Sequence, residues 1–161
     1  EYMRGKPSGH STRELTAARK ADFEIVPQPV PSVHWRYYSD QTWSFMTRFG
    51  DEPVASVPVV LETSNGTTVE AKSDELGMVS LRIPDDFPDV VEGERDMRTA
   101  DFMIRAEHTA NGITYQTALS AAYRINQAHW KSFELGVLVV GIGMVAGGYI
   151  GRVRKNKGKK A

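Results

Sequence analysis

The sequence contains no cysteine, so histidine and the carboxylates are the side chains that could bind a metal ion. The missing thiols exclude disulfides, thiol nucleophiles and thiolate metal sites. No two histidines have the spacing of zinc ligands, so we expect separate surface residues and predict no metal site and no cofactor. The alternative is that the fold brings His10 and His108 together around a metal. The histidines are His10, His34, His108 and His129.

Acidic side chains gather in the segment from Asp85 to Met97. Their spacing is not that of an EF-hand loop, and such a run is usually a solvated loop. Two alternatives stay open, which are contact with a basic partner and weak calcium binding. The acidic residues are Asp85, Asp86, Asp89, Glu92, Glu94 and Asp96.

Motifs that carry catalysis are missing from the sequence. It contains no HExxH, no GxSxG and no phosphate-binding GxxxxGK pattern. No pair of carboxylates has a spacing that indicates general acid and general base chemistry. We therefore predict that the protein is not an enzyme.

Aromatic side chains are concentrated in a short stretch, VHWRYYSDQTW, which starts at Val33. Large aromatic residues often dominate the energetics of protein interfaces, so this stretch is a candidate interface with a partner. An equally open alternative is the edge of a core together with a tyrosine corner. The candidate interface residues are Trp35, Tyr37, Tyr38 and Trp43.

The charges of the chain are distributed unevenly. Its formal net charge is zero, but six of its 20 basic residues follow Gly151. The residues before that cluster carry 14 basic and 20 acidic side chains, a net charge of −6. This balance predicts no nucleic-acid partner for the main part of the chain. It also indicates that the two ends face different surroundings.

An uncharged run of 16 residues, LGVLVVGIGMVAGGYI, extends from Leu135 to Ile150. With its flanks it is long enough to cross the roughly 30 Å hydrocarbon core of a lipid bilayer as a helix. We predict a transmembrane helix over residues 129–151, and the alternative is a buried core helix. Trp130, Phe133, Tyr149, Arg152, Arg154 and Lys155 are the predicted membrane-interface anchors.

The basic cluster also predicts an orientation, because Lys and Arg flank membrane helices mainly on the cytoplasmic side. Residues 152–161 are therefore predicted to be a basic cytoplasmic tail, with the N-terminal domain on the other side. In a bacterium this describes a single-pass inner-membrane protein whose domain lies in the periplasm.

Three glycines recur every fourth residue within the predicted helix, at Gly143, Gly147 and Gly151. This spacing places them on one helix face, where small residues let a second helix approach closely. The predicted partners are the transmembrane helices of a larger membrane protein complex, or a second copy of the chain. The alternative is that glycine is simply frequent in membrane helices.

Before the apolar run, the sequence predicts an arm and one domain. Residues 1–21 mix charge with Gly, Pro and Ser, which is typical of an extended arm or linker. Residues 22–128 form the predicted extracytoplasmic domain. Strands are predicted at 23–26 and 43–49, and apolar residues at every second position of 79–83 indicate a strand with one buried face.

Two Asn-Gly dipeptides, at 65–66 and 111–112, predict hairpins with type I′ turns. Together the elements predict an all-β fold, namely an Ig-like (transthyretin-like) antiparallel β-sandwich of about seven strands plus one C-terminal transmembrane α-helix. The hairpin strands are expected at 57–64, 67–72, 101–110 and 113–123.

The stretch from Asp51 to Pro84 is similar to Ig-like repeats related to carboxypeptidase regulatory domains. In these repeats a G-x-P-V-x-x-x-x-V strand leads to a T-D-x-x-G-x-x-x-x-x-I-P turn and strand. The matching positions are Pro53, Val54, Val59, Ser73, Asp74, Gly77, Leu81, Ile83 and Pro84.

With its flanking strands, the region 22–126 resembles the C-terminal half of the bacterial family labelled domain of unknown function 4198. Members of that family include periplasmic proteins associated with nickel and cobalt uptake. The metal-rich first half of such proteins has no counterpart in this sequence. The matching motifs concern the fold and not an activity.

These observations predict a non-catalytic, membrane-anchored accessory subunit. Its single helix is expected to dock to a larger inner-membrane protein complex, while its domain stabilises or covers the extracytoplasmic face of that complex. The alternative, implied by the resemblance alone, is a periplasmic metal-handling component of a nickel or cobalt uptake system.

Overall fold

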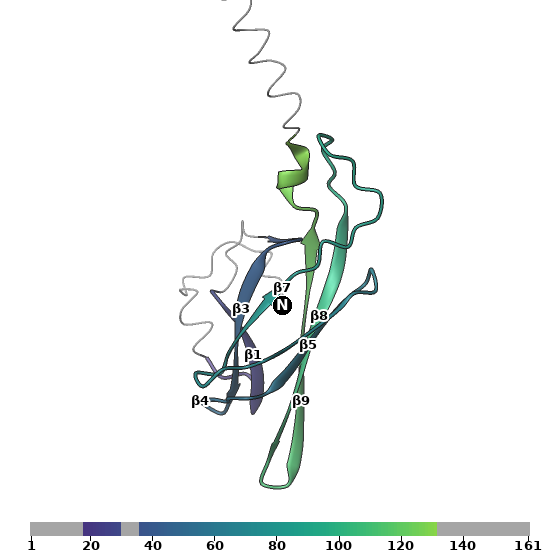
Figure 1. The fold of residues 1–161 in the computed structure, drawn as a ribbon. Helices are drawn as coiled ribbons and strands as arrows, with labels where there is room; N and C mark the ends of the chain where they lie inside the picture. The colour runs from purple at the N-terminus through teal and green to yellow at the C-terminus, as the bar shows by residue number, and fades with distance from the viewer. Residues whose placement is uncertain (1–17, 30–35, 132–161) are drawn as a thin grey trace, which may run out of the picture. The chain divides into compact units, whose positions relative to one another are not determined.

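A computed structural model of the protein describes residues 18–29 and 36–131 (Figure 1). Residues 91–95 and 128–131 belong to a compact unit separate from the other described residues. No helix within these ranges has the length and apolar character needed to cross a bilayer. Most of the predicted membrane helix lies outside the described residues, and so do Phe133, Gly143, Gly147, Tyr149, Gly151, Arg152, Arg154 and Lys155.

The regular structure of the described chain is β-strand, arranged in two sheets, apart from one short 3₁₀ helix. In one sheet, β3 pairs with β1 along one edge and with β7 and the short β4 along the other. The second sheet has the order β2-β9-β8-β5-β6. The strands are β1 (Phe23–Gln28), β2 (Tyr37–Tyr38), β3 (Thr42–Phe49), β4 (Glu52–Pro53), β5 (Pro58–Thr63), β6 (Thr68–Lys72), β7 (Met78–Arg82), β8 (Thr99–Ala110) and β9 (Ile113–Arg124), followed by the 3₁₀ helix η1 (Gln127–Trp130).

The period-two pattern of apolar residues explains how the sheets pack, since alternate side chains of a strand point to one face. The predicted alternation in β7 is confirmed, because Val79 and Leu81 are buried while Ser80 and Arg82 are exposed. Inward rows of both sheets meet in one apolar cluster. Its largest fully buried members are Tyr123, Phe45, Phe102, Leu61, Leu81, Ile83 and Ile104.

The hairpin around Asn111-Gly112 is confirmed in both position and turn type. Asn111 has φ 53° and Gly112 has φ 76°, as a type I′ turn requires. The pair Ala110 and Ile113 closes the turn and is the first of twelve residue pairs along β8 and β9. Figure 1 shows these two long strands side by side.

The hairpin around Asn65-Gly66 is present, but its predicted type I′ turn is wrong. Of the two residues only Gly66 has a positive φ, of 95°, and the Gly66 amide donates to the Thr63 carbonyl at 3.0 Å. The Thr63 amide donates to the Thr67 carbonyl at 2.9 Å, which leaves a three-residue loop with Gly66 in its last position. Such a loop keeps Asn65 out of the left-handed region.

Gly77 holds the turn between β6 and β7 against the neighbouring sheet edge. Its carbonyl accepts a hydrogen bond of 2.8 Å from the Thr47 amide, and the Thr47 carbonyl accepts one of 3.0 Å from the Val54 amide. The Asp74 carboxylate accepts from the amides of Leu76 and Met78, at 2.9 and 2.8 Å. This is the turn in which the Ig-like resemblance places a glycine.

Replacing Gly77 with alanine is expected to destabilise the fold strongly. The residue has φ +71°, and an added Cβ would lie 2.7 Å from the Thr47 carbonyl oxygen. We expect Gly77→Ala to lower the free energy of unfolding by about 3 kcal/mol, combining left-handed strain with a backbone clash. Urea denaturation followed by circular dichroism measures the change.

The matched control is Gly66→Ala. Gly66 also has a positive φ, of 95°, but no atom lies within 4 Å of an added Cβ. This variant should lose only about 1 kcal/mol. Equal losses in the two variants would show that contact with Thr47 is unimportant.

Candidate functional site

The predicted aromatic interface is largely part of the core. Tyr37 and Trp43 are only 5 % and 7 % exposed, and their rings meet edge to face at 4.6 Å between centroids. Trp43 belongs to the facing sheet, and Tyr37 also contacts Phe102 of its own sheet, at 5.1 Å. The core-edge alternative therefore describes these two residues, because their rings are turned inward between the sheets.

The other two aromatic candidates differ from this pair. Tyr38 is half-buried, and its hydroxyl accepts a hydrogen bond of 3.0 Å from the Gln127 amide group. Trp35 lies outside the described residues.

Asp86 is the centre of a polar cluster that connects three separate segments. Its Oδ2 accepts a hydrogen bond of 2.6 Å from the Thr63 hydroxyl, and its Oδ1 accepts one of 3.2 Å from Asn65 Nδ2. The hydroxyl of Tyr123, the second-last residue of β9, also donates to Oδ1. The carboxylate thus ties the end of β5 and its loop to β9.

The environment of Asp86 fixes the protonation of the cluster. Burial alone raises the pKa of Asp86, but hydrogen bonds from Thr63, Tyr123 and Asn65 outweigh it and lower the pKa below its usual value. Burial raises the pKa of Tyr123, and the hydrogen bond to Asp86 and the charge of Asp86 raise it further. A carboxylate held ionised beside a phenol held neutral is poorly suited to proton transfer near neutral pH.

Asp85, the residue before Asp86, is bonded to a different part of the fold, the segment after β2. The fully buried Ser39 donates its hydroxyl to Asp85 Oδ1 at 2.6 Å and accepts a hydrogen bond of 3.0 Å from the Asn126 amide. The first two residues of the acidic segment therefore have structural partners. Asp85 is nevertheless exposed, as predicted for a solvated loop, whereas Asp86 is half-buried and accepts hydrogen bonds from two side chains of the β5–β6 hairpin.

The middle of the acidic segment belongs to the second unit. Within that unit the Gly93 amide donates to the His129 carbonyl at 2.7 Å, and the Arg95 guanidinium lies over the Trp130 ring, 5.4 Å from its centroid. A cation over an indole face is an attractive contact. Trp130, a predicted membrane-interface anchor, is thus half-buried beside a loop that the sequence did not connect with it.

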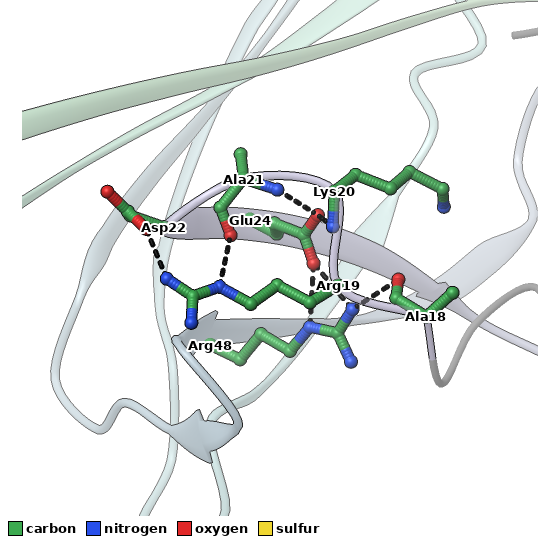
Figure 2. A network of polar contacts seen from close by, with 7 residues as sticks. All are labelled: Ala18, Arg19, Lys20, Ala21, Asp22, Glu24 and Arg48. Carbon is green, nitrogen blue, oxygen red and sulfur yellow. Dashed lines mark hydrogen bonds and ion pairs between the residues drawn. The ribbon is translucent and has the colours of Figure 1, made fainter.

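Glu24 and Arg48 form a buried ion pair on the sheet of β1 and β3 (Figure 2). Arg48 Nε and Nη2 donate to Glu24 Oε2 at 2.7 and 2.5 Å, and both side chains are at least nine-tenths buried. Glu24 Oε1 accepts from the amides of Lys20 and Ala21, at 2.5 and 2.8 Å, while Arg48 Nη2 donates to the Ala18 carbonyl at 2.9 Å.

The ion pair fastens the residues before β1 to the sheet. Burial raises the pKa of Glu24, but the hydrogen bonds from Arg48 and from the Lys20 and Ala21 amides dominate and lower it. Sequence reasoning missed this pair, because its members are 24 residues apart and meet only through the register Glu24↔Arg48. The role of the pair is structural, since both side chains are buried and bonded to each other and to backbone groups of residues 18–21.

The histidines that the structure describes have separate surroundings. His108 lies between the rings of Phe23 and Phe49, each at 5.5 Å between centroids. His129 is in η1, and His10 and His34 lie outside the described residues. Within residues 18–29 and 36–131, no group of three or more His, Asp or Glu side chains is arranged to hold a metal ion.

Comparisons with known proteins give no relative on which to base a function. No family model matches the chain, and neither a curated protein nor a solved structure matches it. The resemblance to the domain of unknown function 4198 family therefore stays a prediction.

Acid should weaken the Asp86 cluster in a defined direction. Because the pKa of Asp86 is lower in the folded protein, its contribution is present above the unfolded value of about 3.9 and is lost as pH falls through the folded value. We expect Asp86→Asn to lower the free energy of unfolding by about 1–3 kcal/mol at pH 7. Its unfolding curves should also depend less on pH below about pH 4.

The control for this comparison is Asp89→Asn, an exposed position with φ 56° that asparagine accepts. This variant should follow the unmodified protein across the same pH range. If Asp86→Asn has the same acid profile as the unmodified protein, the ionised Asp86 does not stabilise the fold.

Removing one member of the buried ion pair should cost more than removing both. Arg48→Met leaves the Glu24 carboxylate buried without its cation, so we expect a loss of about 3 kcal/mol. Adding Glu24→Gln to that variant should restore part of the loss, because no buried charge then remains unpaired. Thermal unfolding of the two single variants and the double variant measures the coupling, and strictly additive losses would contradict it.

Proposed function

We propose that the protein is a non-catalytic accessory subunit tethered to a membrane by residues 129–151. The observation that carries this proposal is the uncharged run from Leu135 to Ile150 and the six basic residues among residues 152–160 that follow it. An apolar run of this length with a basic flank is typical of a single membrane span whose following segment stays in the cytoplasm. The domain before it then lies on the opposite side, in the periplasm of a bacterium.

The domain itself is proposed to be an Ig-like sandwich. In the constant-type architecture the first, second, fourth and fifth strands share one sheet, while the third, sixth and seventh strands form the other. The pairing of β1, β3 and β7 in one sheet and of β5, β8 and β9 in the other follows this division, whereas β6, in the place of the fourth strand, pairs with β5 instead. β1 pairs with β3 in one sheet, and the short β2 pairs in parallel with β9 in the other. The two together fit a first strand that is divided between the sheets.

The polar clusters of this domain support a role in assembly over a role in catalysis. Asp86 and Tyr123 are bound to each other and to Thr63 and Asn65, while Glu24 and Arg48 neutralise each other. A catalytic carboxylate needs a pKa matched to its task and access to a substrate proton. The pKa values of Asp86 and Glu24 are both lowered instead.

The proposed partner is the membrane part of a larger protein complex. Gly143, Gly147 and Gly151 would present one small-residue face to a neighbouring helix, since close van der Waals packing drives helix association in lipid. The domain would then brace or cover the extracytoplasmic side of the same complex. The metal-handling alternative is supported by the family resemblance alone.

Native purification in a mild detergent tests this function. The unmodified chain should be recovered only with detergent and should carry a membrane protein in fixed stoichiometry, which mass spectrometry identifies. Gly147→Ile should lose that partner, because a large side chain separates the two helices. Gly148→Ile, the same change one residue along and therefore on another helix face, should retain it.

Two results would count against the proposal. The first is recovery of the unmodified chain in the soluble fraction after lysis without detergent. The second is equal recovery of the partner with both isoleucine variants.

A further inference from the structure

Two identical dipeptides of this chain, Asn65-Gly66 and Asn111-Gly112, have different surroundings. Asparagine followed by glycine is especially prone to spontaneous deamidation, because glycine leaves the next backbone nitrogen unhindered and lets the chain adopt the conformations that the reaction needs. Both asparagines are exposed, so access to water does not distinguish them. The difference between them lies in how their reacting atoms are bonded.

Deamidation is an attack of the backbone on the asparagine side chain. The nitrogen of the following glycine forms a bond to Cγ of the asparagine, and the bond from Cγ to Nδ2 breaks. The amide proton of the glycine leaves with Nδ2 as ammonia, and a succinimide ring remains. A water molecule then opens the ring at either carbonyl, which gives aspartate or isoaspartate. The overall reaction consumes water and releases ammonia, without oxidation or reduction.

At Asn65 both reacting groups are engaged in hydrogen bonds. The leaving nitrogen, Nδ2, donates to Asp86 Oδ1 and to the Tyr123 hydroxyl, each at 3.2 Å. The attacking nitrogen, the Gly66 amide, donates to the Thr63 carbonyl at 3.0 Å. Reaction at Asn65 therefore requires that the side chain leave the Asp86 cluster and that the turn open.

At Asn111 the reacting groups are free of such bonds. The closing hydrogen bond of a type I′ turn joins its first and last residues, here Ala110 and Ile113, so it does not involve the Gly112 amide. Within residues 18–29 and 36–131, neither this amide nor the Asn111 side chain forms a hydrogen bond. Both the attacking and the leaving nitrogen are thus available.

The turn at Asn111 lies at the end of a hairpin that extends beyond its neighbour in the sheet. The pairing of β5 with β8 ends at Ala106. Further along, His108 and Tyr115 still contact the ring of Phe49, at 5.5 and 4.8 Å between centroids. Figure 1 shows the turn at the free end of the two long strands.

Beyond those rings, only two residue pairs hold the turn closed. They are Thr109 with Thr114 and Ala110 with Ile113. Thr109, Ile113 and Thr114 are exposed, and Ala110 is half-buried. Segments with few buried apolar contacts open locally at a low cost in free energy. Asn111 can therefore reach the conformation for attack while the rest of the fold stays intact.

We propose that Asn111 is a site of spontaneous deamidation in the folded protein, whereas Asn65 is protected by its hydrogen bonds. The aspartate product keeps the turn, because Asp-Gly also takes type I′ geometry. The isoaspartate product adds a methylene group to the main chain and so disturbs the pairing of Ala110 with Ile113. Either product adds a negative charge to the end of the hairpin.

Timed incubation of the full-length chain in mildly alkaline buffer with detergent measures both rates. Trypsin separates the two sites into peptides 49–72 and 106–124. Mass spectrometry follows each peptide, since deamidation raises its mass by replacing an amide with an acid. Isoaspartate is detected with a protein isoaspartyl methyltransferase and labelled S-adenosylmethionine.

The same incubation in concentrated urea provides the reference, because both dipeptides are then free of tertiary contacts. Folding should slow the reaction at Asn65 by about tenfold or more, since its hydrogen bonds must break first. At Asn111 folding should slow the reaction much less. Equal protection of the two asparagines, or stronger protection of Asn111, would overturn the proposal.

Two variants act on one site each. Gly112→Ala should slow the reaction at Asn111 several-fold, because the added methyl group shields the attacking amide, and should leave Asn65 unchanged. No atom lies within 4 Å of the added Cβ, so the variant should fold in spite of φ +76°. An unchanged rate at Asn111 would contradict the proposed attack by the Gly112 nitrogen.

Asp86→Ala tests the protection of Asn65. Without the carboxylate, Asn65 Nδ2 loses one of its two acceptors, so the reaction at Asn65 should become several-fold faster while that at Asn111 keeps its rate. A melting curve recorded in parallel shows that the variant is folded at the incubation temperature. An unchanged rate at Asn65 in the folded variant would show that the Asp86 cluster does not protect it.

Discussion

Contact between the inward rows of the two sheets is the interaction on which the rest of this structure depends. The chain has no cysteine, so no disulfide can replace that contact. Phe45 and Leu81 of one sheet and Leu61, Phe102 and Ile104 of the other are almost completely buried in one apolar cluster. Polar groups near the cluster must then be bonded, because an unsatisfied buried donor or acceptor is costly. Asp86, Ser39 and the Glu24–Arg48 pair meet this requirement at the margins of the core.

Local patterns in the sequence predict much of the fold. The alternation of Val79 and Leu81 identifies a strand, and the two Asn-Gly dipeptides identify the positions of two hairpins, since each signal comes from residues close in sequence. The turn at Asn65 differs from its prediction because its side chain has distant partners, Asp86 and Tyr123. Trp43 could not be assigned to the core or to an interface from composition alone. A dense aromatic stretch is typical of both, and only its register with Leu81 in β7 decides.

The polar clusters were harder to predict than the strands, for a physical reason. An acidic run is normally solvated, but the first two carboxylates of this one lie shortly after β7 and accept hydrogen bonds from hydroxyl and amide donors of distant segments. Ser39 and Asp85 are 46 residues apart in sequence, and Tyr123 and Asp86 are 37 apart. Such pairs become visible only when the sheet order is known.

The direction of β1 has a mechanical consequence. β1 starts near the β8–β9 turn, since Phe23 pairs with Phe49, whose ring contacts Tyr115 at 4.8 Å. It runs parallel to β9, which ends at the opposite extremity of the same unit. A pulling force applied between the start of β1 and the end of β9 is directed along these strands. The six residue pairs of β1 and β3 then bear the load together in shear, so their hydrogen bonds do not break one after another.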